Sequence, residues 1–245
     1  MNAVTKTVTG DINMKQHYHH HDSQGIPMSE DAYLATEPNA DVRREYIDGK
    51  AYAMAGATYN HHLLAGNLFG EFRQHLKGNP CTAFKSDMKV SLKMSIGNNY
   101  VYPDVVVDCD KTGENVYVVT NPLLIVEVLS GTTRKLDQTT KRLGYINLPS
   151  LLEYVMVEQD IALITIMRKS SGWQAVNYYL GDPVTFEAIG LTLSVEEIYD
   201  HVANQDMNDY LARKQRLEED RATGATVMLM EPLTSADFVD GIIKG

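Results

Sequence analysis

The stretch Tyr102-Pro103-Asp104-Val105-Val106-Val107 is followed, after a loop, by Leu123-Leu124-Ile125-Val126-Glu127-Val128-Leu129-Ser130. Both apolar runs are short, rich in β-branched residues and bounded by turn residues, so each predicts a buried strand. Each run carries one carboxylate, Asp104 at the start of the first and Glu127 inside the second. A buried charge is costly unless it is paired or binds a metal. Two carboxylates on neighbouring strands can hold one divalent cation through oxygen ligands.

A polar segment, residues 132–147, follows the second strand and predicts a helix that begins at Thr132 or Thr133 and ends before Pro149. Asp137 and Lys141 are four residues apart, so they share one face of that helix. One interpretation is an ordinary surface ion pair. The other is that the helix brings Lys141 over the end of the Glu127 strand, where a lysine can neutralise charge developing on a phosphate.

Glu45 and His61 are two further candidates for a site. Glu45 lies on the first strand of a hairpin whose turn is Asp48-Gly49, and an exposed strand residue is an equally good interpretation. His61 lies in the first turn of a helix predicted over residues 60–77, and a helix N-terminus favours nearby anions. A surface histidine is at least as good an interpretation of this position.

Local signals predict the other elements. Ser29 and the acidic residues after it predict a short helix that Pro38 ends. Ser194 begins another helix with a capping pattern, and the charged segment 203–222 predicts a third. Further strands are predicted within residues 81–95, 153–158, 161–168, 173–179 and 183–193.

Composition favours one sizeable domain with appendages. The chain has 245 residues, of which 44% are hydrophobic, so global disorder is excluded. Cys81 and Cys109 are the only cysteines, which makes neither a disulfide framework nor a zinc spacing. We see no secretory signal and no apolar run near the ~20 residues of a membrane span. We therefore expect a cytoplasmic protein.

Three regions are predicted: a flexible leader over residues 1–27, a main domain over residues 28–202, and a charged helix with a tail over residues 203–245. The leader contains a cluster of histidines, for which a polar tail is favoured over a metal site. The net charge of −10 counts against non-specific nucleic-acid binding. A local basic surface remains open, because cationic residues flank the central stretch at Lys85, Lys89, Lys93, Arg134, Lys135, Lys141 and Arg142.

The order of these motifs resembles the Uma-two family of restriction endonucleases, a branch of the PD-(D/E)XK nuclease superfamily. The resemblance covers roughly residues 35–200 and is carried by Glu45-Tyr46-Ile47-Asp48-Gly49, His61, Pro103-Asp104, Val126-Glu127-Val128-Leu129-Ser130, Asp137, Lys141 and Tyr145. It implies an α/β (α+β) fold with a restriction endonuclease-like mixed central sheet flanked by helices. It also implies that Asp104 and Glu127 are metal-binding carboxylates.

The chain departs from the superfamily pattern at Leu129, where the usual lysine would lie two residues after the second acid. The resemblance implies that Lys141, from the following helix, takes that role. Gly131 stands where the family commonly has proline, a difference that does not affect the proposed ligands.

The resemblance implies a Mg²⁺-dependent endonuclease (Mn²⁺ is the substitute metal) that hydrolyses DNA. The metal would be held by Asp104, Glu127 and the carbonyl of Val128, and Lys141 would orient the attacking water or stabilise the charge on the pentacovalent phosphate. Glu45 would be an outer metal ligand or help to position a second ion, and His61 would be a proton shuttle or a phosphate contact. Cutting both strands of a duplex suggests a homodimer. The alternatives are a catalytically silent nuclease-fold module that binds nucleic acid or protein, and an assembly protein that uses an amphipathic segment over residues 235–240. DNA and RNA are not distinguished.

Overall fold

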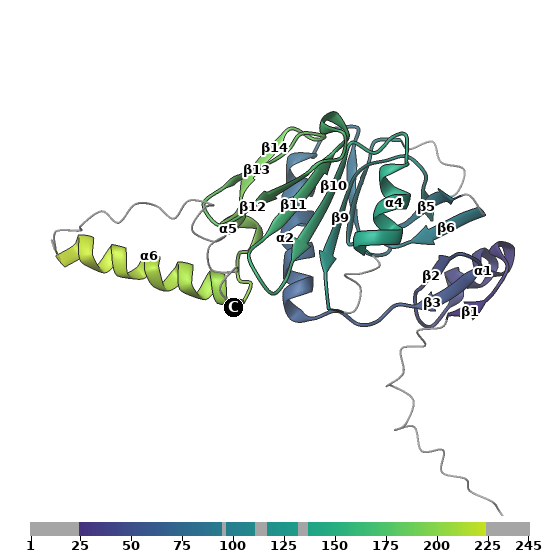
Figure 1. Ribbon diagram of the computed structural model, residues 1–245, viewed down its shortest axis with the longest axis horizontal. Helices are drawn as coiled ribbons and strands as arrows, with labels where there is room; N and C mark the ends of the chain where they lie inside the picture. The colour runs from purple at the N-terminus through teal and green to yellow at the C-terminus, as the bar shows by residue number, and fades with distance from the viewer. Residues whose placement is uncertain (1–24, 95–96, 111–116, 132–136, 224–245) are drawn as a thin grey trace, which may run out of the picture.

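The computed structural model describes residues 25–94, 97–110, 117–131 and 137–223. Within these residues the chain forms two six-stranded sheets and one two-stranded sheet, with helices packed on them (Figure 1). The first residues of this part, Ile26–Pro27, already form strand β1, although the sequence places them at the end of a flexible leader. The predicted helix caps at residues 132–133 and the predicted segment at 235–240 lie outside the described residues.

The central sheet has the strand order β12-β11-β10-β9-β7-β4. Strands β9 and β10 run parallel and all other neighbours in this sheet run antiparallel, so the predicted mixed sheet is confirmed. Its members are β4 (Thr82–Lys85), β7 (Val105–Asp108), β9 (Pro122–Leu129), β10 (Glu153–Glu158), β11 (Ile164–Arg168) and β12 (Ala175–Tyr178).

The second sheet has the order β1-β3-β2-β6-β5-β8. The hairpin that joins two of its strands turns at Asp48 and Gly49, whose φ angles are 49° and 80°, as the Asp-Gly pair predicts. Its members are β1, β2 (Arg44–Ile47), β3 (Lys50–Ala53), β5 (Lys89–Met94), β6 (Gly97–Val101) and β8 (Val118–Val119). Strands β13 (Pro183–Phe186) and β14 (Leu191–Ser194) form a separate antiparallel pair, where the sequence predicted one short strand.

The helices begin where capping residues occur. The Ser29 hydroxyl accepts a hydrogen bond from the Ala32 N–H at the start of α1, and Ser194 forms a full capping box with Glu197 at the start of α5. The helices are α1 (Glu30–Thr36), the 3₁₀ helix η1 (Glu37–Asn39), α2 (Tyr59–His75), the π-helix η2 (Asp137–Lys141), α4 (Arg142–Ile146), the 3₁₀ helix η3 (Lys169–Ser171), α5 (Val195–Ile198) and α6 (Gln205–Thr223).

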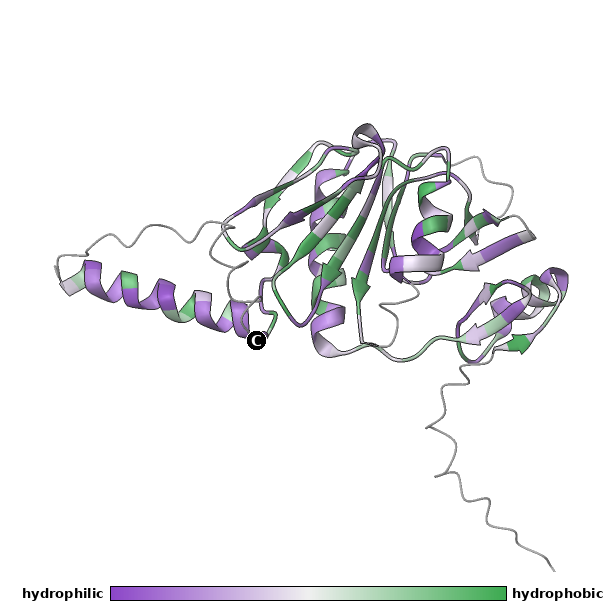
Figure 2. Cartoon of the chain, viewed as in Figure 1, coloured by the Kyte–Doolittle hydropathy of each residue, from purple (hydrophilic) through white to green (hydrophobic). Residues whose placement is uncertain are grey.

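The two faces of the central sheet are covered by different helices. Val126 and Val128 of β9 point into a core with Leu68 and Phe72 of α2. Ile125 and Leu129 point the other way, into a core with Tyr145 of α4 and residues of β5. Because side chains alternate along a strand, Glu127 lies on the same face as Ile125 and Leu129. In Figure 2, hydrophobic residues (green) run along the strands of the central sheet, between α2 and α4.

The short π-helix changes which residues of the 137–146 segment are buried. The side chain of Leu143 is exposed, although it is apolar, and Gly144 and Tyr145 are buried. A π-helix closes i→i+5 hydrogen bonds, so it rotates the following turn relative to an α-helix. A Cβ at Gly144 would lie 2.7 Å from Leu92 Cδ1, so a larger residue at this position requires the Leu92 side chain to move.

The two cysteines form a disulfide, which the sequence did not predict. Strands β4 and β7 pair with Thr82 opposite Asp108, so Cys81 and Cys109 continue that pairing by one residue and meet. This bond closes the end of the β4–β7 ladder that lies farthest from Asp104.

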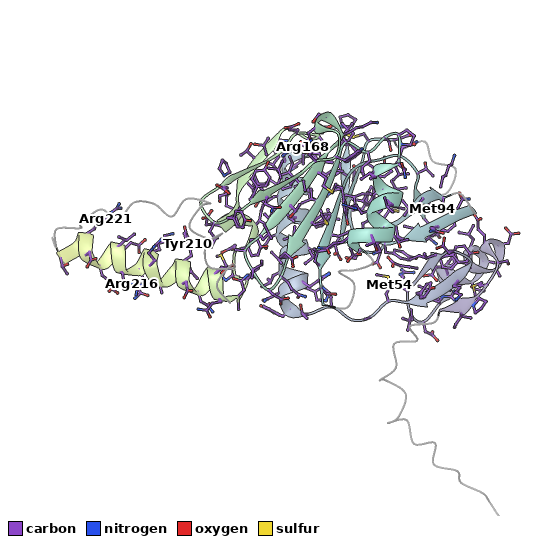
Figure 3. All side chains as sticks on the ribbon, viewed as in Figure 1. Met54, Met94, Arg168, Tyr210, Arg216 and Arg221 are labelled. Atoms are coloured by element: carbon purple, nitrogen blue, oxygen red, sulfur yellow. A yellow bond between two sulfur atoms is a disulfide. The ribbon has the colours of Figure 1, made fainter. Side chains whose placement is uncertain are left out.

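Helix α6 extends away from the sheets (Figure 1) and confirms the predicted charged helix. The Asp206 carboxylate anchors its first turn by accepting a hydrogen bond of 2.7 Å from Ala162 N–H. Tyr210, Arg216 and Arg221 lie along its length (Figure 3). None of the helices in the described part of the chain has the length and apolar character that a membrane crossing requires.

Candidate active site

Asp104 and Glu127 meet where the β7–β9 ladder ends. The register pairs Val105 with Val126, and one further step sets Asp104 opposite Glu127. The Val128 N–H donates a hydrogen bond of 2.7 Å to Asp104 Oδ2, which fixes this carboxylate against β9. The two predicted metal-binding carboxylates are therefore cross-strand neighbours.

Lys141 lies among three carboxylates. Its Nζ is 2.9 Å from Glu45 Oε1, 3.1 Å from Asp137 Oδ1 and 3.3 Å from Glu127 Oε1. All four side chains are buried, and Lys141 is 5% exposed, so the interpretation of Asp137 and Lys141 as a surface ion pair is wrong. The contact with Glu127 is aligned as a hydrogen bond, whereas the one with Asp137 is an ion pair without that alignment.

Glu45 approaches this cluster from the second sheet. Its carboxylate accepts a hydrogen bond of 3.1 Å from Tyr102 N–H and faces the ammonium of Lys141. The interpretation of Glu45 as an exposed strand residue is therefore wrong. Its partners among the described residues are a lysine and a backbone amide, a geometry that suits an anchor for Lys141 better than an outer metal ligand.

Two buried tyrosines close the inner side of the cluster. The Tyr145 hydroxyl donates a hydrogen bond of 2.7 Å to Glu127 Oε1, and the Tyr154 hydroxyl donates one of 3.1 Å to the Asp137 carbonyl oxygen. Burial raises the pKa of Tyr145 well above its usual value, so its hydroxyl stays protonated and acts as a donor. Sequence reasoning named Tyr145 and Asp137 without a role. The spacing of 137, 141 and 145 at four-residue intervals was the available signal.

His61 reaches the site from the first turn of α2. Its Nε2 lies 3.3 Å from Asp104 Oδ2, so it is not a surface histidine. Its Nδ1 is buried and has no hydrogen-bond partner among the described residues. The Thr58 hydroxyl caps this helix by accepting a hydrogen bond of 3.2 Å from the His61 backbone N–H.

The cluster has more carboxylates than ammonium groups, because Glu45, Asp137 and Glu127 surround Lys141 and Asp104 lies opposite Glu127. Burial raises the pKa of Glu127 well above its usual value, the charge of Lys141 opposes this rise, and the neighbouring carboxylates add to it. Burial lowers the pKa of Lys141, but the carboxylates of Glu127, Glu45 and Asp137 outweigh it, so its pKa is well above the usual value. Lys141 is therefore charged, and the site favours a further cation.

The residues present fit a magnesium ion with a small number of protein ligands. Among the described residues, no group of three or more His, Cys, Asp and Glu side chains forms a metal cage. Mg²⁺, however, is commonly bound through one or two carboxylates, with waters and substrate phosphates completing its shell. The contacts from the described residues reach Oδ2 of Asp104 and Oε1 of Glu127, and they leave Asp104 Oδ1 and Glu127 Oε2 for a cation. The carbonyl of Val128 points to the same side as its N–H, towards Asp104.

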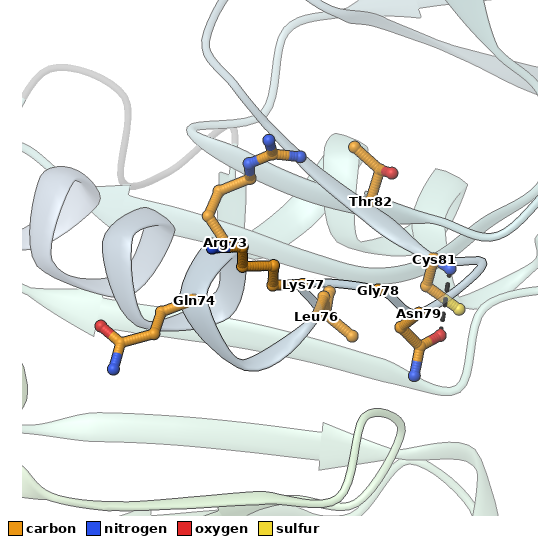
Figure 4. Close-up of a pocket in the computed structure, with 8 residues that line it drawn as sticks. All are labelled: Arg73, Gln74, Leu76, Lys77, Gly78, Asn79, Cys81 and Thr82. Carbon is orange, nitrogen blue, oxygen red and sulfur yellow. Dashed lines mark hydrogen bonds between the residues drawn. The ribbon is translucent and has the colours of Figure 1, made fainter.

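A separate hollow of about 390 Å³ lies at the C-terminal end of α2 (Figure 4). It is open to solvent and is bordered by Arg73, Lys77 and Cys81, with Asn79 Oδ1 accepting a hydrogen bond of 3.1 Å from Cys81 N–H. It lies at the Cys109 end of β7, whereas Asp104 precedes the other end. The hollow has no carboxylate among its lining residues, in contrast to the cluster around Lys141.

Comparison with known proteins gives consistent matches. The model of a family described as "Uma2: Putative restriction endonuclease" matches residues 30–196. Two uncharacterized proteins of Synechocystis sp. are similar to this chain. The protein slr1290 is 34% identical over 175 residues, covering 70% of this chain and 91% of that protein. The protein sll1609 is 35% identical over 130 residues, which cover 52% of this chain and 72% of that protein.

A solved structure from Anabaena variabilis has the same fold. It is described as that of "a putative nuclease belonging to DUF820". Its TM-score is 0.60, and the match covers 72% of this chain and 100% of that chain at 16% identity. The likeness shows the α+β nuclease fold, with mixed sheets flanked by helices.

Proposed function

The chain belongs to the Uma2 family, described as "Putative restriction endonuclease", and on that premise we propose that it is a Mg²⁺-dependent endonuclease that hydrolyses DNA phosphodiester bonds. The observation that carries the proposal is that Asp104 and Glu127 lie opposite each other at the end of the β7–β9 ladder, with the Lys141 ammonium 3.3 Å from the Glu127 carboxylate. A restriction endonuclease acts on nucleic acid, and the chemistry of this site suits a phosphodiester.

Each residue has a role that its position supports. Asp104 Oδ1, Glu127 Oε2 and the Val128 carbonyl would hold the cation. The two carboxylate oxygens have no contact from the described residues, and a backbone carbonyl beside them is an oxygen ligand of the kind that Mg²⁺ takes. When bound, a divalent cation activates water and neutralises charge on the phosphate. Lys141 is placed to orient the attacking water or to stabilise charge on the phosphate oxygens. His61 holds Asp104 in place.

The proposal is tested by incubating the full-length protein with supercoiled, linear and single-stranded DNA, and with RNA, in Mg²⁺, in Mn²⁺ and in a chelator. We expect metal-dependent cleavage of DNA that is lost in Asp104→Asn and in Glu127→Gln. Each variant keeps the size of the side chain and removes its charge. Glu218→Gln is the matched control, because Glu218 is exposed on α6 and has no contact with the site.

Cleavage that survives both Asp104→Asn and Glu127→Gln would overturn the assignment of the site. Binding of DNA without cleavage under every metal condition would instead favour a catalytically silent module of the same fold. Cleavage of RNA alone would keep the site and change the substrate. Sedimentation of the protein with and without duplex DNA tests whether it forms a homodimer. A homodimer would place one active site at each strand of a duplex.

A further inference from the structure

Lys141 and Glu127 are each held by side chains that would not touch a metal. The ammonium of Lys141 is closer to Glu45 and Asp137, at 2.9 and 3.1 Å, than to Glu127 at 3.3 Å. Glu127 Oε1 accepts the shorter of its two hydrogen bonds from Tyr145, at 2.7 Å. The contact with Glu127 is thus the longest of the three that Lys141 makes, and each partner has a shorter contact elsewhere.

We propose that Asp137 and Glu45 are positioning residues for Lys141, and that Tyr145 is the positioning residue for Glu127. This inference rests on the proposed function and assigns separate tasks to three side chains. Asp137 and Glu45 keep the ammonium in place, and Tyr145 keeps Glu127 turned so that Oε2 is the oxygen available to a cation.

The number of donors on a lysine explains why this matters. An ammonium has three N–H donors, and three carboxylates surround that of Lys141. Because the contact with Asp137 is an ion pair without hydrogen-bond alignment, Asp137 attracts the ammonium by its charge and does not require an aligned N–H. A donor of Lys141 is thus left for a water or a phosphate oxygen, while Asp137 and Glu45 keep the ammonium in place.

The local fold supports this division of tasks. Asp137 and Lys141 are the first and last residues of η2, a single π-helical turn, and this turn buries both of them. Short π-helical segments are frequently found at functional sites. Among the described residues, none donates a hydrogen bond to Asp137 Oδ1. The charge of this buried oxygen is offset by the ammonium of Lys141, 3.1 Å away.

The test compares Asp137→Asn, Glu45→Gln and Tyr145→Phe with the wild-type protein, using Mg²⁺ titration by calorimetry beside kcat and KM for DNA. For Asp137→Asn and Glu45→Gln we expect kcat to fall by about 10- to 100-fold, because a lysine that is no longer held is misplaced. Their Mg²⁺ affinity should fall less than that of Tyr145→Phe, because the ligands are untouched and only a neighbouring charge is removed. For Tyr145→Phe we expect Mg²⁺ affinity to fall by about 10- to 100-fold, the range for side chains that orient a metal ligand.

Tyr199→Phe is the matched control for Tyr145→Phe. It also removes a buried hydroxyl, but the Tyr199 hydroxyl donates to the carbonyl oxygens of Glu158 and Leu163. We expect Tyr199→Phe to lower stability and to change neither Mg²⁺ affinity nor kcat. Thermal midpoints of all variants show how far each substitution affects the fold.

The outcomes separate this inference from the proposed function. A wild-type protein that binds no Mg²⁺ and cuts no nucleic acid overturns the proposed function and the inference with it. A wild type that binds and cuts, with Asp137→Asn weakening Mg²⁺ affinity as much as Tyr145→Phe does, overturns only the inference and makes Asp137 a ligand. The inference is also overturned if the variants lose stability while kcat, KM and Mg²⁺ affinity stay unchanged.

Discussion

The imidazole of His61 and the carboxylate of Asp104 are held together across two elements, with Nε2 3.3 Å from Oδ2. The same Oδ2 accepts the Val128 N–H, so Asp104 is fixed from both sides. We predict that His61→Ala weakens Mg²⁺ binding by about tenfold, because groups that orient a metal ligand have effects of this size. Calorimetric titration measures the change.

His62→Ala is the control for that prediction, because His62 is the neighbouring residue and its side chain is exposed. Its Mg²⁺ affinity should equal that of the wild type. Equal losses in both variants would mean that the helix N-terminus, rather than the contact with Asp104, supports binding.

Binding of Mg²⁺ should stabilise the folded protein. At a free concentration 100 times its dissociation constant, the free energy of unfolding should rise by about 2.7 kcal/mol. The rise should be absent in Asp104→Asn, which lacks one ligand charge. Urea unfolding with and without Mg²⁺ measures it, and the same rise in both proteins would place the ion elsewhere.

Glu153 and Arg168 form a buried ion pair of 2.8 Å across the β10–β11 ladder. Glu153 also accepts the N–H groups of Glu187 and Ala188, which ties the β13–β14 hairpin to the sheet. Glu153→Ala should lower the free energy of unfolding by about 3 kcal/mol, because it removes the shorter of the two ion pairs of Arg168, whose other carboxylate is Glu187 at 3.4 Å, and leaves two backbone N–H groups without their acceptor. Asp87→Ala breaks the exposed pair with Arg43, and in that control urea unfolding should show a change of at most about 1 kcal/mol.

The disulfide between Cys81 and Cys109 should contribute to stability. The two cysteines are 28 residues apart in sequence, and a loop of that size predicts a loss of about 3–4 kcal/mol when both are replaced by serine. A reductant should destabilise the wild type and leave the double variant unchanged. If reduction has no effect on the wild type, the bond is not formed in solution.

The cytoplasmic location stays a prediction. A disulfide that forms in solution counts against this location, because disulfides are rare in reducing compartments.

Lys89 is buried beside the ring of Tyr33, with Nζ 5.6 Å from the ring centroid. Burial lowers its pKa, the charge of Glu37 opposes this, and Arg43 adds to it. A lysine with a pKa below its unfolded value is destabilising while charged, and that cost disappears as the pH rises towards the unfolded value. Lys89→Met should therefore be more stable than the wild type at pH 7.

The advantage of Lys89→Met should shrink as the pH approaches 10.5, the ordinary lysine pKa. Lys93→Met is the control, because Lys93 lies on the same face of β5 and is exposed. Its stability should follow that of the wild type at both pH values. A difference for Lys89→Met that is independent of pH would assign the effect to packing instead of charge.

Several elements followed from the sequence because their signals are local. The Asp48-Gly49 pair predicts a hairpin since its backbone suits φ above zero, and both residues adopt it. Ser194 and Glu197 predict a capping box that depends on four residues alone. The β-branched runs around Asp104 and Glu127 predict buried strands, and their order identified the family that the comparison confirmed.

The tertiary structure decided how these elements meet. Glu45 and Lys141 are far apart in sequence, and a carboxylate on a strand has the same pattern whether it faces water or a lysine. The disulfide depends on the register of β4 against β7, and the burial of Tyr145 depends on a π-helical turn that no spacing rule marks. The sequence by itself therefore determined the strands, the caps and the two carboxylates, because short-range backbone and burial preferences set them. Only the packing of two sheets against η2 and α4 decided which charges share one buried cluster, because electrostatic partners across a fold are chosen by register and burial and not by proximity in sequence.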